Sequence, residues 1–326
     1  MKDTTIIEIA DKLNIGKSTV SRALRHCGGV DSETRQSILA ETGILSYEPD
    51  SHCDLYTILP NVPQYFWDPV FQGILSEKTT SKLKIKNNIY TKLRDEETVL
   101  HYLDEAEQLN ARAIIISTHV TEKIYKRLAH LSYRRLVILL SEYDKITNCF
   151  FVGSDMYHDG YMVGKQYLSS HADKKLVLLS SPNNQNAQTR LDGFCQAIEE
   201  QAPKLIRNAI HVSIDATLFR NPKTLPSRLA SLLANATTET NDICIYSPFG
   251  LHALPLAIKK AKLSDCTVCL CHDFFENLSE SCVQTVCNQD TLSQGKTAMH
   301  LALKYIFENM YPDHKNTYVA SIITTS

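Results

Sequence analysis

The sequence has few glycines and prolines and no large excess of charge of either sign. Its 326 residues include only 11 glycines and 11 prolines, a content that excludes collagen-like and low-complexity chains. Its 34 basic and 36 acidic side chains leave a formal charge of −2, so the net charge does not attract the protein to nucleic acid or anionic lipid. Because 43% of the residues are hydrophobic, we expect most of the chain to fold, into about two domains.

Long apolar segments are also lacking. The longest apolar runs, such as residues 136–140 and 113–116, are far shorter than the roughly 20 residues that a membrane-spanning helix needs. Residues 1–12 contain no apolar core followed by a cleavage site, as a secretion signal would. We therefore expect a cytoplasmic protein that does not bind membranes and whose ten cysteines are reduced thiols.

Sequence patterns of enzymes and of metal sites are missing as well. The chain has no Gly-rich phosphate loop, no Gly-x-Ser-x-Gly turn and no His-Glu-x-x-His helix. Cys266, Cys269, Cys271 and His272 are of the types that bind zinc, but they lack paired Cys-x-x-Cys spacing, and alternating cysteines in a strand often pack as small apolar side chains. We therefore predict no enzyme activity, no metal and no cofactor.

The N-terminal segment predicts two short helices joined by a turn. Thr5 and Glu8 have the spacing of a capping box at a helix start, and residues 14–16 break the helical pattern before it resumes at 17–24. The polar and basic side chains that this second helix and its end direct outward are Lys17, Ser18, Ser21, Arg22 and Arg25. Such a helix-turn-helix can place its second helix in the DNA major groove, although an ordinary solvated helix face explains the same charges.

The same region closely resembles the headpiece of the lactose-repressor (LacI) family of bacterial transcription factors. The resemblance rests on GKSTVSRAL at 16–24, VDSETR at 30–35 and YEP at 47–49. It implies that Lys17, Ser18 and Arg22 read base edges of operator DNA and that Thr19 and Ser21 contact phosphates. By the same resemblance, residues 31–42 would form a third, supporting helix.

The region after residue 49 departs from the family pattern. The family continues with a hinge helix whose Leu wedges into the minor groove, whereas here residues 55–59 already read as a strand. Because an inserted wedge kinks DNA and adds affinity, the shortened hinge predicts weaker binding or a different geometry.

From residue 55 onward, short apolar runs alternate with amphipathic segments. The predicted strands are 55–59, 85–89, 113–117, 136–140, 176–179, 210–214, 243–246 and 268–270. The predicted helices are 69–82, 96–110, 122–131, 157–170, 188–200, 226–235 and 251–262. This alternation predicts an α/β architecture of doubly wound parallel sheets in two lobes, with a break near residues 148–153 and a ligand crevice between the lobes.

This part resembles the periplasmic-binding-protein-like effector module of the same family. The resemblance rests on VGSDMY at 152–157 and on TRLDGF at 189–194. The implied ligand-binding residues are Gln64, Phe66, Trp67, His119, Asp155, Arg190, Phe249, Asp273 and Asn288. Two of these have ordinary alternatives, since Trp67 could be core and Asp155 a helix N-cap. Pro248 and Phe249 also replace an Asn-Asp pair that the family commonly uses on its effector.

We predict a homodimeric transcription regulator, a repressor by preference. Residues 1–53 form a helix-turn-helix headpiece with a shortened hinge that binds double-stranded operator DNA, and residues 54–326 bind a sugar-like effector and dimerise. The first lobe comprises about 54–150 plus 287–316, and the second about 151–286 plus the C-terminal strand. The alternative is a small-molecule binding protein with a vestigial headpiece and no regulated operator.

Overall fold

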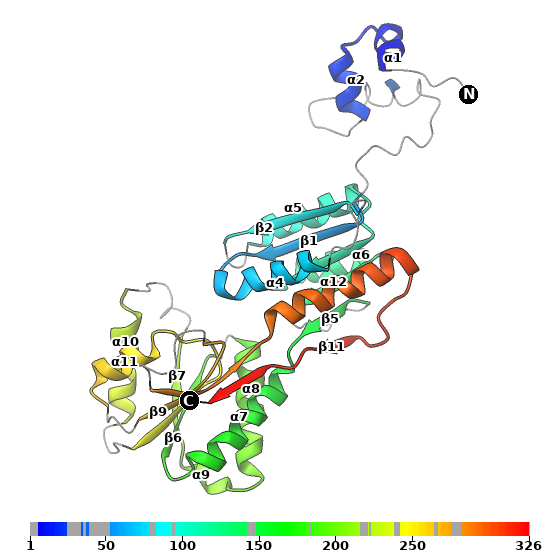
Figure 1. The fold of residues 1–326 in the computed structure, drawn as a ribbon. Coiled ribbons are helices and arrows are strands. Elements are labelled where there is room, and N and C mark those ends of the chain that lie inside the picture. The colour runs from blue at the N-terminus through cyan, green and yellow to red at the C-terminus, as the bar shows by residue number, and fades with distance from the viewer. Residues whose placement is uncertain are drawn as a thin grey trace.

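The chain forms two parallel-stranded sheets flanked by helices, preceded in sequence by a pair of short helices (Figure 1). The computed structural model describes residues 6–24, 34, 37–38, 53–77, 83–92, 95–141, 146, 148–182, 184–215, 221, 223–237, 242–263, 267–274 and 282–325. The two-lobed α/β fold predicted from the alternation of strands and helices is confirmed.

The first sheet contains six parallel strands in the order β11-β5-β4-β3-β1-β2. Their bounds are β1 Leu55–Pro60, β2 Ile85–Tyr90, β3 Ala113–Ile116, β4 Leu136–Leu140, β5 Phe150–Gly153 and β11 Asn316–Tyr318. β1, β3 and β4 are buried along their whole length. Such strands are nearly continuous apolar runs because helices cover both of their faces.

The second sheet has the order β12-β10-β9-β8-β6-β7. Its strands are β6 Lys175–Ser180, β7 Ile210–Ser213, β8 Ile243–Ser247, β9 Val268–His272, β10 Val283–Asn288 and β12 Ile322–Thr325. Five of them pair in parallel, while β12 runs antiparallel to β10. The second sheet therefore ends in an antiparallel edge strand supplied by the last residues of the chain.

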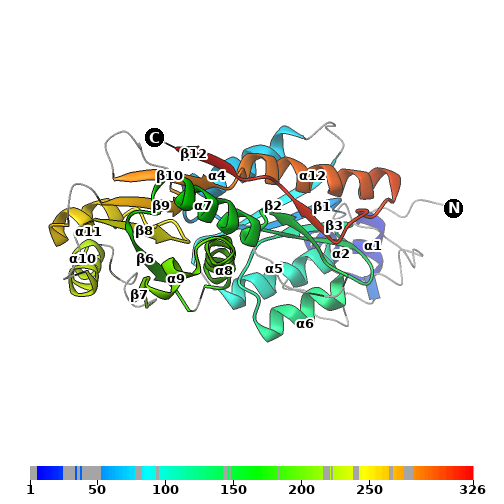
Figure 2. The ribbon, with the colours of Figure 1, turned by 90° about the horizontal axis from the view of Figure 1, so that it is seen from below.

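Helices cover both faces of each sheet (Figures 1 and 2). On the first sheet, α4 and α12 pack on one face and α5 and α6 on the other; on the second, α7, α8 and α9 oppose α10 and α11. Their bounds are α4 Gln64–Ser76, α5 Glu96–Gln108, α6 Glu122–Leu131, α7 Met156–Ser170, α8 Gln185–Glu199, α9 Pro203–Arg207, α10 Leu225–Ala236, α11 Leu254–Ala261 and α12 Thr291–Glu308. Among the described residues, none of the helices is long and apolar enough to cross a membrane.

The chain crosses between the two sheets three times. β5 of the first sheet leads into α7, β10 of the second leads into α12, and β11 of the first leads into β12. These crossovers bring Ser154, Gln289 and Ser321 to the junction of the lobes, where their side chains form part of one hydrogen-bonded network.

Helices α7 and α8 approach each other closely enough to require glycine. A Cβ atom on Gly160 would lie 1.9 Å from the carbonyl oxygen of Arg190, and one on Gly193 would lie 2.0 Å from that of Tyr157. Backbone atoms cannot yield to such overlaps as a flexible side chain could. The close approach fixes the first turn of α7 against α8, next to the cavity described below.

The eight predicted strands coincide with β1 to β4 and β6 to β9, whereas β5, β10 and β11 were not predicted and β12 was expected only as a C-terminal strand without bounds. β5 occupies the segment predicted as the break between lobes and is an inner strand of the first sheet. Polar residues interrupt the apolar residues of β10, and β11 and β12 are too short and too exposed to give an apolar run. Their pairing depends on partners that are distant in sequence.

The helix predicted at 69–82 begins earlier, at Gln64, and ends at Ser76. Pro69 suggested a helix start, yet it lies inside α4. Helices α9 and α12 were also missed. For α12 the signal was present, because Asp290 caps the helix by accepting a hydrogen bond from the Ser293 amide at 3.0 Å, and apolar residues follow at helical spacing.

Candidate functional site

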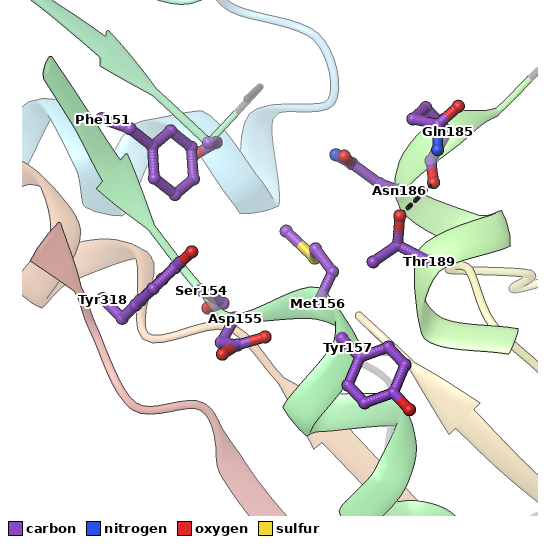
Figure 3. Close-up of a pocket in the computed structure, with 10 residues that line it drawn as sticks. Phe151, Ser154, Asp155, Met156, Tyr157, Gln185, Asn186, Thr189 and Tyr318 are labelled. Carbon is purple, nitrogen blue, oxygen red and sulfur yellow. Dashed lines mark hydrogen bonds between the residues drawn. The ribbon is translucent and has the colours of Figure 1, made fainter. Parts of the chain in front are cut away.

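A cavity of about 510 Å³ lies where strands of the first sheet meet the first turns of two helices of the second lobe (Figure 3). Ten described residues line it: Ser141, Phe151, Ser154, Asp155, Met156, Tyr157, Gln185, Asn186, Thr189 and Tyr318. They come from both lobes and from the β5–α7 crossover. The volume falls in the range of small-molecule sites.

Capping interactions place the first turns of α7 and α8 at the cavity. Asp155 accepts a hydrogen bond from the His158 amide at 3.0 Å, and Asn184 accepts one from the Ala187 amide at 3.1 Å. Each side chain satisfies a backbone donor that the helix itself leaves unpaired. The partial positive charge of a helix start favours acceptor oxygen atoms nearby.

The lining combines aromatic faces with uncharged polar groups. Phe151 and Tyr318 lie on one side of the cavity, and their ring centroids are 6.1 Å apart, while Asn186 and Thr189 lie on the other side (Figure 3). Asp155 is the one carboxylate among the ten described lining residues, and none of the ten has a basic side chain. Aromatic faces pack on apolar C–H patches, and hydroxyl and amide groups orient ligand hydroxyls.

Directly after Thr189, the buried side chain of Arg190 forms an ion pair inside the second lobe. Its Nη1 lies 2.8 Å from Oδ2 of Asp273 and donates to the carbonyl oxygen of Pro248 at 3.2 Å. Arg190 is only 3% exposed, and its Nε and Nη2 have no hydrogen-bond partner among the described residues. A buried guanidinium with two unused donors is suited to bind a further acceptor.

A chain of hydrogen bonds connects this ion pair to the crossovers. Gln289 donates from Nε2 to Asp273 at 3.1 Å, and Gln294 donates from Nε2 to Oε1 of Gln289 at 3.1 Å and to Ser154 at 3.2 Å. Ser141, a cavity residue at the end of β4, donates to Oε1 of Gln294 at 2.7 Å. The network therefore joins the buried Arg190 region, the cavity and two crossovers.

The network ends at a buried carboxyl group on α7. Ser321 of the third crossover lies 2.9 Å from the Ser154 hydroxyl and 2.7 Å from Oδ2 of Asp159. Burial raises the pKa of Asp159 to about 6, although the Ser321 hydroxyl and the Arg190 charge oppose the shift. The junction of the lobes thus holds a carboxyl group that titrates within two pH units of neutrality.

The nine predicted ligand residues lie in several places. Asp155 lines the cavity and is also the α7 N-cap, and Arg190 and Asp273 form the buried pair. Trp67, 6% exposed, packs in the core of the first lobe beside the half-buried Phe66. The remaining four are an exposed Gln64 in the first turn of α4, an exposed His119 after β3, a buried Phe249 after β8, and Asn288, which bonds both backbone groups of Phe274.

Only Asp155 of the nine is among the described residues that line the cavity. Sequence reasoning missed Ser141, Tyr157, Asn186 and Tyr318. Thr189 belongs to the motif at 189–194 and Asn186 precedes Arg190 by about one helical turn, so that motif could have directed attention to both. No local pattern marks Tyr318, because it reaches the cavity through the pairing of β11 with β5.

The N-terminal helices are α1, Ile6–Lys12, and α2, Lys17–Leu24. They pack through a small apolar cluster that includes Ile9, Val20 and Ile38. Lys17 and Ser18 are exposed and Thr19 is half-buried, as a helix with one outward face requires. The side chains of the predicted DNA-binding residues Ser21 and Arg22, and all of Arg25, lie outside the described part of the chain, as do Thr5 and most of the predicted third helix.

Within the described ranges, no group of three or more His, Cys, Asp or Glu side chains is placed to hold a metal ion. The clustered cysteines predicted to be packing residues include Cys269 and Cys271, which are buried in the core of the second lobe.

The sequence is similar to two regulators of Bacillus subtilis. It is 24% identical to the NTD biosynthesis operon regulator NtdR over 206 residues and 22% identical to the HTH-type transcriptional regulator DegA over 208 residues. Each match covers 60% of this chain, and the chain spans only 61% of the length of each relative. No family model matches the sequence.

Solved structures share the fold at low sequence identity. A LacI-family transcriptional regulator from Silicibacter pomeroyi aligns over 98% of both chains, with a TM-score of 0.65 and 14% identity. The glucose-galactose binding protein GanP from Geobacillus stearothermophilus aligns over 84% of this chain and 98% of its own, with a TM-score of 0.68 and 13% identity. By name, the four similar proteins are regulators or a sugar-binding protein, and none is an enzyme.

Proposed function

This chain is a relative of helix-turn-helix transcription regulators of the LacI type, and from that premise we propose that it is a cytoplasmic repressor whose operator affinity is set by a small polar effector. In this proposal residues 1–53 bind DNA, and residues 54–326 bind the effector and dimerise. The observation that carries it is a cavity shared by two lobes, in a chain that begins with two short packed helices.

The second N-terminal helix is the proposed DNA-reading element. Val20 is buried against α1, which leaves Lys17 and Ser18 exposed at the start of α2. Lysine can donate to guanine O6 and N7 in the major groove, and serine can pair with several bases. Arg22, one turn further along, would provide a second, bidentate contact. Thr19, Ser21 and Arg25 would bind phosphates and set the register.

We propose that the regulator binds its operator as a homodimer. One headpiece of two or three short helices makes too few contacts for operator affinity, whereas two headpieces related by symmetry bind half-sites at fixed spacing. The near-neutral charge of the whole chain supports this arrangement, because affinity must then come from local contacts presented twice.

The effector class follows from the composition of the cavity. Its lining has three aromatic rings and several hydroxyl and amide groups, together with Asp155 and no basic residue among those described. An anionic ligand such as a sugar phosphate would meet the Asp155 carboxylate and no basic side chain among the described lining residues, at a cost in desolvation and repulsion. The cavity therefore favours an uncharged polyhydroxylated molecule, such as a neutral sugar.

Effector binding would be coupled to the headpieces through the lobes. The cavity residues Ser141 and Ser154 belong to the network that joins the crossovers, so a ligand that competes for their hydroxyls changes the contacts that set the angle between lobes. A change in lobe angle alters the spacing of two headpieces in a dimer. Coupling of this kind typically amounts to about 1 to 3 kcal/mol and is reciprocal.

DNA binding can be tested with full-length protein and duplex DNA enriched from a random library. Arg22→Ala should weaken binding to the enriched site by roughly 5- to 150-fold and relax selectivity, because each base contact contributes about 1 to 3 kcal/mol. Lys204→Ala, which removes an exposed charge on α9, is the matched control and should change neither. Failure to enrich any sequence, with little binding even at low salt, would instead favour a binding protein with a vestigial headpiece.

Effector binding can be tested by thermal shift with neutral sugars, sugar phosphates, nucleosides and amino acids. We expect stabilisation by a neutral sugar and none by its phosphate. Tyr157→Ala should abolish the shift, whereas Tyr133→Ala, at a more exposed tyrosine outside the cavity, should retain it. A shift given only by phosphorylated compounds would contradict the proposed class, and a shift retained in Tyr157→Ala would contradict the proposed cavity.

A further inference from the structure

Two cysteines of the second sheet lie with their thiols in contact. The sulfur atoms of Cys269 and Cys282 are 3.7 Å apart, and the Cys269 amide donates to the carbonyl oxygen of Cys282 at 2.9 Å. Cys269 lies in β9, and Cys282 directly precedes β10, whose Val283 is the register partner of Cys269. Neighbouring strands joined in this way place the two Cα atoms roughly 5 to 6 Å apart, within the range that disulfides span.

The two thiols differ in burial and in pKa, as the attacking and the resolving thiol of a disulfide-forming pair do. Cys269 is fully buried, and burial raises the pKa of its thiol. Cys282 is only partly buried, and the hydrogen bond from Cys269 lowers its pKa. Because the thiolate is the nucleophile, Cys282 is the thiol that reacts first, and Cys269 is positioned to react second.

From this contact we propose that Cys269 and Cys282 form an oxidation site that hydrogen peroxide or an organic hydroperoxide converts into a disulfide. The Cys282 thiolate attacks a peroxide oxygen, the O–O bond breaks, and the leaving oxygen takes up a proton, which leaves a sulfenic acid on Cys282. The Cys269 sulfur then displaces that oxygen, which departs as water with the thiol proton. The two sulfur atoms are oxidised and the peroxide is reduced, so one peroxide molecule closes one disulfide.

The site is separate from the proposed effector cavity. Cys269 and Cys282 lie at the N-terminal ends of β9 and β10, whereas Asp273 and Gln289 follow the C-terminal ends of the same strands. The disulfide would therefore tie the two strands together at the ends opposite the buried ion pair. It does not depend on whether the protein binds DNA or a sugar.

The test is to treat the full-length protein with hydrogen peroxide, block free thiols, and digest without reduction. Trypsin alone leaves both cysteines on one peptide, 263–296, so a protease that cuts after glutamate is added to cleave at Glu276 and Glu280. We expect fragments 263–276 and 281–296 to remain joined, with a mass lower by two hydrogen atoms than the sum of the two fragments in which Cys269 and Cys282 are reduced and the other three cysteines are blocked. Tandem mass spectrometry should assign the link to Cys269 and Cys282.

Variants identify the pair. Cys282→Ser and Cys269→Ser should each abolish the link, and Cys282→Ala provides a second variant at the less buried position. Cys287→Ser is the matched control, because Cys287 lies in β10 but is buried on the other face of the sheet. Oxidation that leaves the two thiols unlinked in the wild-type protein, or a link that persists in both Cys282 variants, would overturn the proposal.

Discussion

Asp159→Asn is expected to change how the stability of the second lobe depends on pH. The carboxyl group is 5% exposed, and burial raises its pKa from 3.8 to about 6. The folded state therefore holds the proton more tightly than the unfolded state. The contribution of this group to the free energy of unfolding is complete below about pH 4, declines as the pH rises through 6, and stays low above that.

The size of the effect follows from the shift. About two pKa units at about 1.4 kcal/mol each give a loss of roughly 3 kcal/mol between pH 4 and pH 7. Asparagine has nearly the same shape, carries no charge, and can still accept the hydrogen bond from Ser321. The variant should therefore gain stability relative to wild type as the pH rises, by up to about 3 kcal/mol at pH 7.

The measurement is urea unfolding, followed by circular dichroism, of wild type and variant at several pH values between 4 and 7. Subtracting the two curves cancels the other titrating groups, including Glu105 and Glu107, whose pKa values are lowered. Asp192→Asn, at an exposed carboxylate of α8, controls for the loss of one negative charge. A stability difference that stays constant from pH 4 to pH 7 would refute the reasoning.

Two further substitutions test the Arg190–Asp273 ion pair and the close packing of α7 against α8. Asp273→Asn should lower the free energy of unfolding in urea by about 3 to 5 kcal/mol, because Arg190 would keep a buried charge without its counter-ion. A decrease below about 1 kcal/mol would contradict this. Gly193→Ala should lower the free energy of unfolding by about 1 to 3 kcal/mol, since the new Cβ would lie 2.0 Å from the Tyr157 carbonyl oxygen. Gly16→Ala, whose Cβ would meet no heavy atom closer than 3.5 Å, is the matched control, and equal losses at both sites would count against the close helix approach.

Several of the strands that were predicted from the sequence are fully buried, and their burial leaves a signal in the local sequence. β3 and β4 are uninterrupted apolar runs because helices cover both faces of the sheet, and that requirement acts on every residue of the strand. β11 carries no such signal: it has three residues, none fully buried, and exists because β5 offers a free edge. Edge pairing depends on residues more than 150 positions away, which no local window contains.

The cavity was less predictable than the fold. Arg190 and Asp273 were predicted as ligand-binding residues because both lie in recognisable motifs, and the structure places them in contact with each other as a buried ion pair. Tyr318 and Ser141 could not be found in this way, because serine and tyrosine are common on any surface. They acquire their position only when the first sheet assembles with a strand from the end of the chain.

Each lobe is built from separate segments of the chain, and this affects the order in which the two lobes can fold during synthesis. The first lobe needs α12 and β11, which follow the entire run of residues from α7 to β10. During synthesis from the N-terminus, that first lobe stays incomplete while almost all of the second is already outside the ribosome. A nascent chain stalled after β10 should thus expose the apolar face of the first sheet that α12 covers in the folded protein. Chaperones bind surfaces of this kind. In uninterrupted synthesis the face is covered once α12 and β11 have left the ribosome.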